Sequence, residues 1–123
     1  MTGSHRPILV VDDDADIRES LVEVLTSEGF TTMSAGNGRE ALQLLRDGSP
    51  QPCVILLDLM MPVMSGFQFL EERNKDPLLS GTPVVVITAA GVSDKTNPAM
   101  LRAPILPKPI HLPRLLKIIQ QLC

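Results

Sequence analysis

Short apolar runs of strand length alternate along this chain with segments of helical periodicity. The apolar runs cover residues 8–11, 30–34, 53–57, 83–87 and 104–107. Regular alternation of strands and helices is typical of an α/β domain with a parallel sheet. Runs 8–11 and 53–57 show no polar alternation, which indicates strands covered on both faces. Run 30–34 is more polar and run 104–107 contains prolines, so we expect both at sheet edges.

Capping residues and breakers delimit the predicted helices. Asp14 or Asp16 is expected to cap the first helix, whose apolar stripe ends at Gly29. Asn37 opens a second helix, which Gly48 ends, and a third follows Gly66. Residues 91–103 should hold only a short fourth helix, because Pro98 prevents an uninterrupted one. An amphipathic helix over 111–122 closes the chain.

Chemically active side chains gather where the predicted strands end. Asp12 and Asp13 follow the first strand, Asp58 the third, Thr88 the fourth and Lys108 the fifth. Ligands of open parallel sheets bind at the carboxyl ends of the strands. Each residue alone has a structural explanation as a turn, cap or loop residue, but their shared position predicts one functional pocket.

Electrostatics narrows the use of this pocket. Two like charges ~4 Å apart repel by roughly 1–4 kcal/mol across effective dielectrics of 80 to 20. A hard cation such as Mg²⁺ relieves that repulsion between carboxylates. Lys108 and Thr88 could then bind a phosphoryl group while one carboxylate acts as nucleophile. The pattern therefore predicts phosphoryl chemistry.

Composition and charge exclude several classes of function. The net charge is −3 and no run of basic residues occurs, so we expect no direct nucleic-acid binding. No apolar stretch reaches the ~20 residues of a membrane span, and no signal peptide precedes the first strand. Cys53 and Cys123 lack metal-site spacing, and we expect two reduced thiols in a cytoplasmic protein. Residues 1–6 are expected to form a disordered or artificial tail before one domain over 7–123.

Four segments together resemble the receiver family of bacterial response regulators. These are residues 8–14, 56–62 with Gly66, 86–89, and 108–109. The resemblance covers nearly the whole chain. It implies a (βα)₅ flavodoxin-like fold with strand order 2-1-3-4-5 and helices on both faces of the sheet.

The resemblance also implies a role for each residue of the pocket. Asp58 would be the phosphoacceptor, in a phosphorelay from the phosphohistidine of a kinase or phosphotransfer protein. Asp13 would bind Mg²⁺ directly, Asp12 through water, and Met60 through its backbone carbonyl, with Mn²⁺ as a substitute. Thr88 and Lys108 would bind phosphoryl oxygens, Ala89 would keep the approach open, and the bond from Lys108 to Pro109 would be cis.

Three features depart from the family pattern. Ile105 occupies a switch position that is usually aromatic. The segment between Thr88 and Lys108 is slightly short and carries Pro98. Met60 and Ala90 offer no polar side chain beside the phosphoryl site, so we predict slow loss of the phosphoryl group. We also expect phosphorylation to reshape the face made by the fourth helix, fifth strand and fifth helix.

Other functions are open at this stage. A metal-dependent phosphohydrolase could use the same acids, although Met60 stands where the haloacid-dehalogenase type has its general acid. A flavin or nucleotide binder would need a glycine- or hydroxyl-rich loop after the first strand, which is absent. A receiver-like binding scaffold is a further alternative. We expect a switch that catalyses its own phosphorylation and dephosphorylation rather than a conventional turnover enzyme, and a monomer or weak dimer.

Overall fold

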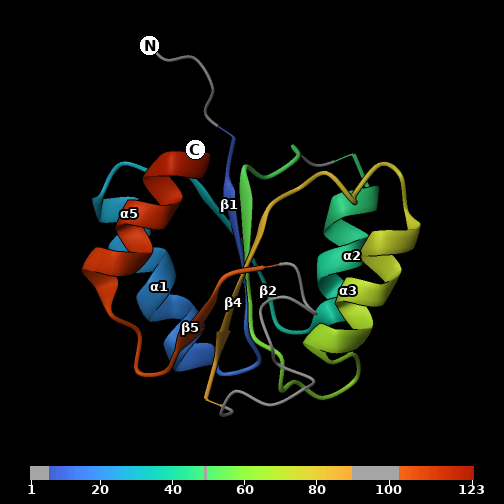
Figure 1. The fold of residues 1–123 in the computed structure, drawn as a ribbon, viewed down its shortest axis with the longest axis horizontal. Coiled ribbons are helices and arrows are strands. Elements are labelled where there is room, and N and C mark those ends of the chain that lie inside the picture. The colour runs from blue at the N-terminus through green and yellow to red at the C-terminus, as the bar shows by residue number, and fades with distance from the viewer. Residues whose placement is uncertain (1–5, 49, 90–102) are drawn as a thin grey trace.

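Five parallel strands form the central sheet of the computed structural model (Figure 1), which describes residues 6–48, 50–89 and 103–123. Their order is β2-β1-β3-β4-β5, so the fold predicted from the resemblance is confirmed. The strands are β1 Ile8–Val11, β2 Thr32–Ala35, β3 Val54–Leu57, β4 Val84–Thr88 and β5 Ile105–Pro107. The polar β2 and the proline-bearing β5 lie at the two edges, as predicted.

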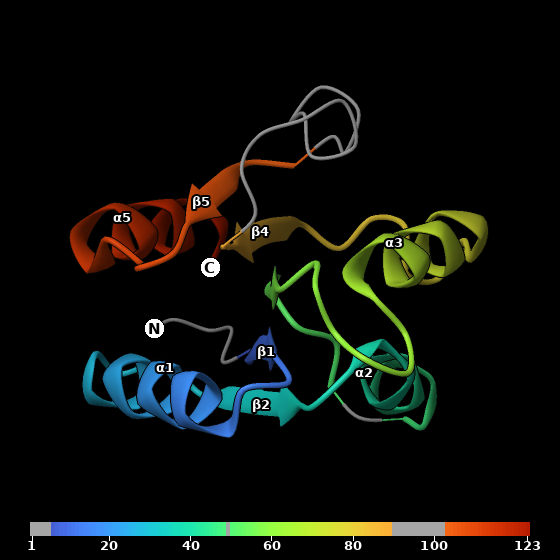
Figure 2. The same ribbon diagram turned by 90° about the horizontal axis from the view of Figure 1, so that it is seen from below.

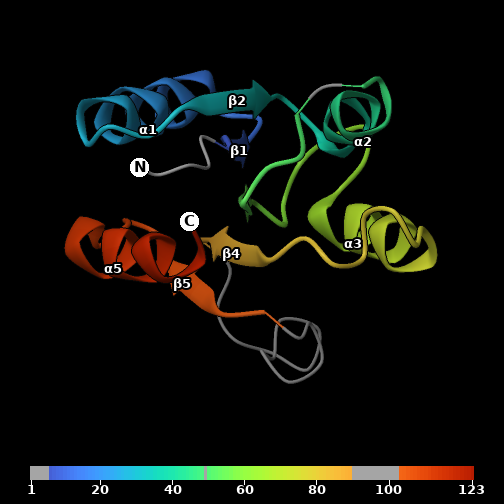
Figure 3. The same cartoon turned by 90° about the horizontal axis from the view of Figure 1, so that it is seen from above.

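Helices cover both faces of the sheet. In the described part of the chain they are α1 Ala15–Ser27, α2 Gly38–Arg46, α3 Gly66–Lys75 and α5 Leu112–Leu122. Helices α1 and α5 pack on one face and α2 and α3 on the other, as the views from below and from above show (Figures 2 and 3). The fourth helix predicted within 91–103 lies outside the described residues, apart from the buried Ala103.

The inner strands β1 and β3 are apolar at every position, and β4 is apolar up to its last residue, Thr88, because each face of the sheet meets a separate core. Leu9 and Val11 point to the α2 and α3 side, whereas Ile8 and Val10 point to the α1 and α5 side. All four side chains are at most 1% exposed. Side chains alternate between the faces of a strand, so a run without polar residues is what two cores require.

Local capping sets where each helix begins. Asp14 caps α1 by accepting hydrogen bonds from the backbone N–H groups of Asp16 and Ile17. This settles the choice between Asp14 and Asp16, since Asp16 lies inside the first turn. Asn37 caps α2 as predicted, and Ser65 begins α3 through a reciprocal capping box with Gln68.

The prediction of two reduced thiols is wrong for this structure. Cys53 and Cys123 form a disulfide across a sequence separation of 70 residues. Cys53 precedes β3, and α5 runs opposite to the strands, so its last residue returns to the amino-terminal edge of the sheet (Figure 1). Packing of α5 therefore unites two cysteines whose spacing in the sequence gave no sign of a pair.

Candidate functional site

The predicted site residues converge at the carboxyl edge of the sheet. Asp12 follows β1, Asp58 follows β3, Thr88 is the last residue of β4, and Lys108 follows β5. These four strands are neighbours, so their carboxyl ends open on the same edge. The edge lies at the end of the sheet opposite the C-terminus (Figure 1).

Three carboxylates form a compact acidic cluster. Oxygen atoms of Asp12, Asp13 and Asp58 all lie within 4.8 Å of one another. Asp12 and Asp58 are only 3% and 5% exposed, while Asp13 is open to solvent. Closely spaced carboxylate oxygens with one open side suit a hard divalent cation that retains several waters, such as Mg²⁺.

Lys108 supplies the positive charge that partly balances the cluster. Its Nζ lies 3.0 Å from Asp12 Oδ2 and 3.4 Å from Asp58 Oδ2. Burial alone would lower the pKa of Lys108, but the hydrogen bond and charge of Asp12, with those of Asp58, raise it above its ordinary value. The ammonium is therefore charged at neutral pH and held between two acids.

Burial dominates the ionisation of Asp58. Loss of hydration raises the pKa of the Asp58 carboxyl above 3.8, and the charge of Asp12 acts in the same direction. A hydrogen bond from the Met60 backbone N–H, 3.2 Å from Oδ1, and the Lys108 ammonium oppose the rise. The site thus holds a carboxylate whose negative charge is only partly compensated by the protein.

The backbone beside Lys108 ties β5 to β4. The Lys108 N–H donates to the Thr88 carbonyl at 3.0 Å, and the Lys108–Pro109 peptide bond is cis, as the resemblance predicted. The Thr88 side chain is 1% exposed. Ala89, directly after it, is exposed, whereas Ala90 lies outside the described residues.

A close approach of backbone shapes the loop after Asp58. The Gly66 N–H donates to the Leu59 carbonyl at 3.0 Å, and a Cβ on Gly66 would overlap the Asp58 carbonyl. Between them, Val63 has a φ of 70°, and the Met64 N–H donates across it to the Pro62 carbonyl at 2.8 Å. This strained γ-turn compresses the loop, so that α3 begins close to the backbone of Asp58 and Leu59.

Ile105 and Met60 differ in burial. Ile105 is half-buried and packs against the core on the α2 and α3 side of the sheet. Met60 is 62% exposed, so its thioether stands in solvent rather than in the core. Neither side chain brings a polar group to the acidic cluster.

Sequence reasoning missed Arg18. This residue of α1 is partly buried, and its Nη1 donates to the Asp12 backbone carbonyl at 2.7 Å. Nothing in the pattern marked it, because its spacing on the helix is equally consistent with a solvated arginine.

A sequence model of the response regulator receiver domain matches residues 8–120. The chain therefore belongs to the receiver domain family of response regulators, and the predicted family is confirmed. Receiver domains of this family bind Mg²⁺ and interact with histidine kinases or phosphotransfer proteins.

Curated relatives support the same assignment. The chain is 45% identical over 89 residues to the DNA-binding response regulator MtrA of Mycobacterium bovis, covering 72% of this chain and 37% of that protein. It is 38% identical over 91 residues to the probable transcriptional regulator ycf27 of Porphyra purpurea, covering 74% and 35%. The chain thus spans little more than a third of the length of these relatives.

Solved structures show the same fold. Chemotaxis protein CheY4 of Vibrio cholerae superposes with a TM-score of 0.85 at 30% identity, covering 98% of this chain and 100% of that one. Response regulator TrrA of Thermotoga maritima, solved in complex with Mg²⁺ and BeF, gives 0.82 at 29% identity, with 96% and 99% covered.

Proposed function

We propose that this receiver domain is a phosphorylation switch and that Asp58 accepts the phosphoryl group. The observation that carries the proposal is the buried Asp58 carboxylate, 3.4 Å from the Lys108 ammonium and grouped with Asp12 and Asp13. A carboxylate in phosphoryl-transfer proteins can act as nucleophile. One Asp58 oxygen forms the new bond to phosphorus as the bond from phosphorus to the donor histidine nitrogen breaks.

Each neighbouring group has a role in this proposal. Asp12, Asp13, Asp58 and the backbone carbonyl of Met60 would hold Mg²⁺, with Mn²⁺ as a substitute. When bound, the cation neutralises charge that develops on the transferred phosphoryl oxygens. Lys108 would move from its present carboxylate partners to a phosphoryl oxygen, and the Thr88 hydroxyl would donate a hydrogen bond to another.

Intact-mass measurement after treatment with acetyl phosphate and Mg²⁺ tests the acceptor. Wild type should gain the mass of one phosphoryl group, and Asp58→Ala should gain none. Omission of Mg²⁺ is the control, and it should reduce labelling of wild type. Equal labelling of wild type and Asp58→Ala would contradict the proposal.

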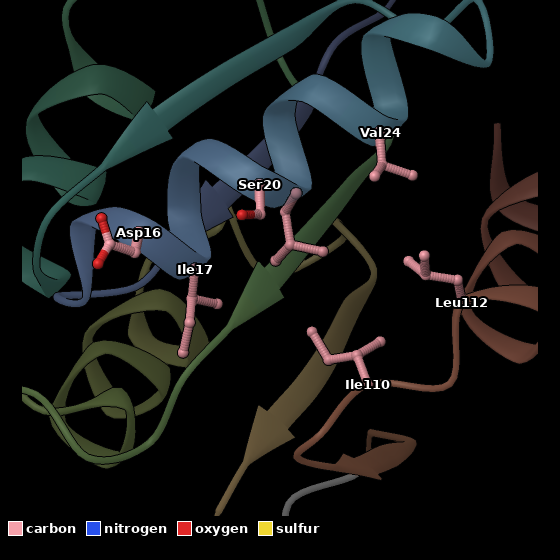
Figure 4. A pocket seen from close by; sticks show the side chains of 7 residues that line it. Asp16, Ile17, Ser20, Val24, Ile110 and Leu112 are labelled. Atoms are coloured by element: carbon pink, nitrogen blue, oxygen red, sulfur yellow. The ribbon is translucent and has the colours of Figure 1, made fainter.

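A hydrophobic groove between α1 and the segment that leads into α5 supports a docking site for the phosphodonor protein. It has a volume of about 300 Å³ and lies between Ile17 and Val24 of α1 and Ile110 and Leu112, the latter being the first residue of α5 (Figure 4). One wall follows Asp12 and Asp13 closely in the chain, and the other follows Lys108. We propose that an apolar face of the histidine-bearing partner covers this groove and so brings its phosphohistidine to Asp58.

Comparing a protein phosphodonor with acetyl phosphate distinguishes a defect in docking from a defect in the phosphoryl-transfer step. Ile17→Ala combined with Val24→Ala should slow transfer from a phosphotransfer domain bearing phosphohistidine roughly tenfold, a loss of ~1.4 kcal/mol of transition-state stabilisation. Labelling by acetyl phosphate, which needs no docking surface, should stay unchanged. Glu19→Ala, on the exposed side of α1, is the matched control. Equal losses with both donors would place the defect in the chemistry instead.

The remaining expectations about this protein form part of the same proposal. We propose a monomer or weak dimer in the cytoplasm, acting as a switch that turns over its own phosphoryl group. Within the described residues no helix is long and apolar enough to cross a membrane. The net charge of −3 supports the view that this domain does not itself bind nucleic acid.

A further inference from the structure

Arg18 lies in the second turn of α1, yet its side chain turns back towards the end of β1. Its Nη1 donates to the Asp12 carbonyl at 2.7 Å, six residues earlier in the chain. The residue is partly buried. Ordering a long arginine side chain costs conformational entropy, and here the ordered side chain holds the Asp12 carbonyl through a short hydrogen bond.

That contact completes a full set of partners for Asp12. The Asp12 N–H donates to the Ala35 carbonyl at 3.2 Å, and Oδ1 accepts from the Asp14 N–H at 2.9 Å. Oδ2 accepts from Lys108 Nζ at 3.0 Å. Arg18 binds the remaining group, the backbone carbonyl, so the orientation of the peptide between Asp12 and Asp13 depends on the guanidinium.

Gly36, just after β2, lies beside the Arg18 guanidinium. A Cβ at Gly36 would lie 3.6 Å from Arg18 Nη1 and 3.2 Å from Glu40 Oε2. The guanidinium therefore lies next to Gly36, between the end of β1 and the start of α2.

We propose that Arg18 is a positioning residue for the acidic cluster: by holding the Asp12 carbonyl, it directs the Asp12 and Asp13 carboxylates towards Asp58 and strengthens cation binding. This inference rests on the proposed function, because it takes the cluster to be a Mg²⁺ site. Groups that orient metal ligands typically contribute a factor of roughly 10 to 100 in metal affinity.

The charge of Arg18 has an effect on Mg²⁺ affinity opposite to that of its positioning role. The positive guanidinium repels a nearby cation, so loss of its charge alone would tighten Mg²⁺ binding. Arg18→Lys keeps the charge but loses the fixed planar donor. The positioning role predicts weaker binding for both Arg18→Ala and Arg18→Lys, whereas a purely electrostatic role predicts tighter binding for the first and no change for the second.

The experiment is calorimetric titration of the unphosphorylated protein with Mg²⁺, with melting temperatures measured in EDTA. Arg18→Ala should weaken Mg²⁺ binding roughly tenfold and Arg18→Lys somewhat less. The weakening should persist at higher ionic strength, where charge effects are screened. Arg39→Ala, which removes an exposed arginine of α2, is the control and should leave the affinity unchanged.

Three results would overturn the assignment. Unchanged or tighter Mg²⁺ binding in both Arg18 variants, with wild type binding normally, refutes the role of Arg18 alone. Melting temperatures in EDTA that fall in proportion to the loss of affinity, well beyond that of Arg39→Ala, show a general structural role instead. A wild type that neither binds Mg²⁺ nor gains a phosphoryl group on Asp58 overturns the proposed function together with this inference.

Discussion

At the scale of one residue, ionisation of the buried Asp58 carboxyl lowers the free energy of unfolding, and a single substitution can measure this cost. Its pKa is raised in the folded state, chiefly by burial, so as pH rises above 3.8 the unfolded chain ionises first and the free energy of unfolding falls. Asp58→Asn removes this cost and also the ion pair with Lys108. We expect the variant to be more stable than wild type by roughly 1 kcal/mol at neutral pH without Mg²⁺.

Melting temperatures across acidic to neutral pH in EDTA check this prediction. The advantage of Asp58→Asn should shrink as pH falls through the raised pKa of the folded state towards 3.8, and should be smallest below 3.8, where the wild-type carboxyl is protonated in both states. Mg²⁺ should raise the melting temperature of wild type more than that of the variant. A variant less stable than wild type at neutral pH in EDTA would show that the Lys108 pair outweighs the burial cost.

Met60 governs a second prediction at the residue scale, the lifetime of the phosphoryl group. Its exposed side chain has no polar atom suited to orient an attacking water beside Asp58. We expect phosphorylated wild type to decay several-fold more slowly than Met60→Asn, and more slowly again than Met60→Asn with Ala90→Glu. Met60→Leu is the apolar control. The decay is followed by intact-mass measurement. A half-life of phosphorylated wild type no longer than that of the double variant would refute this idea.

At the scale of elements, the disulfide attaches the end of α5 to the start of β3. Closing a loop of 70 residues restricts the unfolded chain and stabilises the fold by about 4 kcal/mol in the chain-entropy model. We expect dithiothreitol to lower the free energy of unfolding by up to that amount. Cys123→Ala should reproduce the loss and become insensitive to dithiothreitol. Equal stability of wild type with and without reductant would contradict a stabilising crosslink.

The disulfide requires Cys53 and Cys123 to be oxidised, whereas the proposed cytoplasmic location favours reduced thiols. Reducing compartments keep most cysteines as thiols. Alkylation of free thiols in intact cells, followed by mass analysis, distinguishes the two forms of Cys53 and Cys123. Complete protection from alkylation supports the crosslink in the cell, whereas complete alkylation shows that the protein works there as the reduced form.

At the scale of the whole molecule, the proposed switch would connect Asp58 with the face formed by β5 and α5. Thr88 and Lys108 join the site to β4 and β5, and the Lys108 N–H binds the Thr88 carbonyl. Movement of either side chain towards a phosphoryl group should therefore displace β5 and α5. We expect amide chemical shifts to change in Ile105–Pro107 and Leu112–Leu122 when Mg²⁺ and beryllofluoride, a phosphoryl mimic, are added. Asp58→Ala is the control, and unchanged shifts on that face in wild type would contradict the proposed readout.

Local patterns predicted most of the fold because their causes are local. Apolar runs form strands that need two covered faces, and Asn37 and Gly29 act on backbone groups within a few residues of themselves. Strand bounds moved by a residue or two: the predicted run 30–34 became Thr32–Ala35. The choice between Asp14 and Asp16 as the cap needed the structure, since both have a suitable side chain.

The sequence by itself determined the α/β alternation and the placement of acids, threonine and lysine at strand ends, because periodicity and chain order control both. Only the tertiary structure decided the 3.0 Å pair of Lys108 with Asp12, 96 residues apart, and the disulfide of Cys53 with Cys123. The same holds for the contact of Arg18 with the Asp12 carbonyl. Such contacts depend on the order of the strands and on how the helices pack on the sheet, and no local pattern of residues records either.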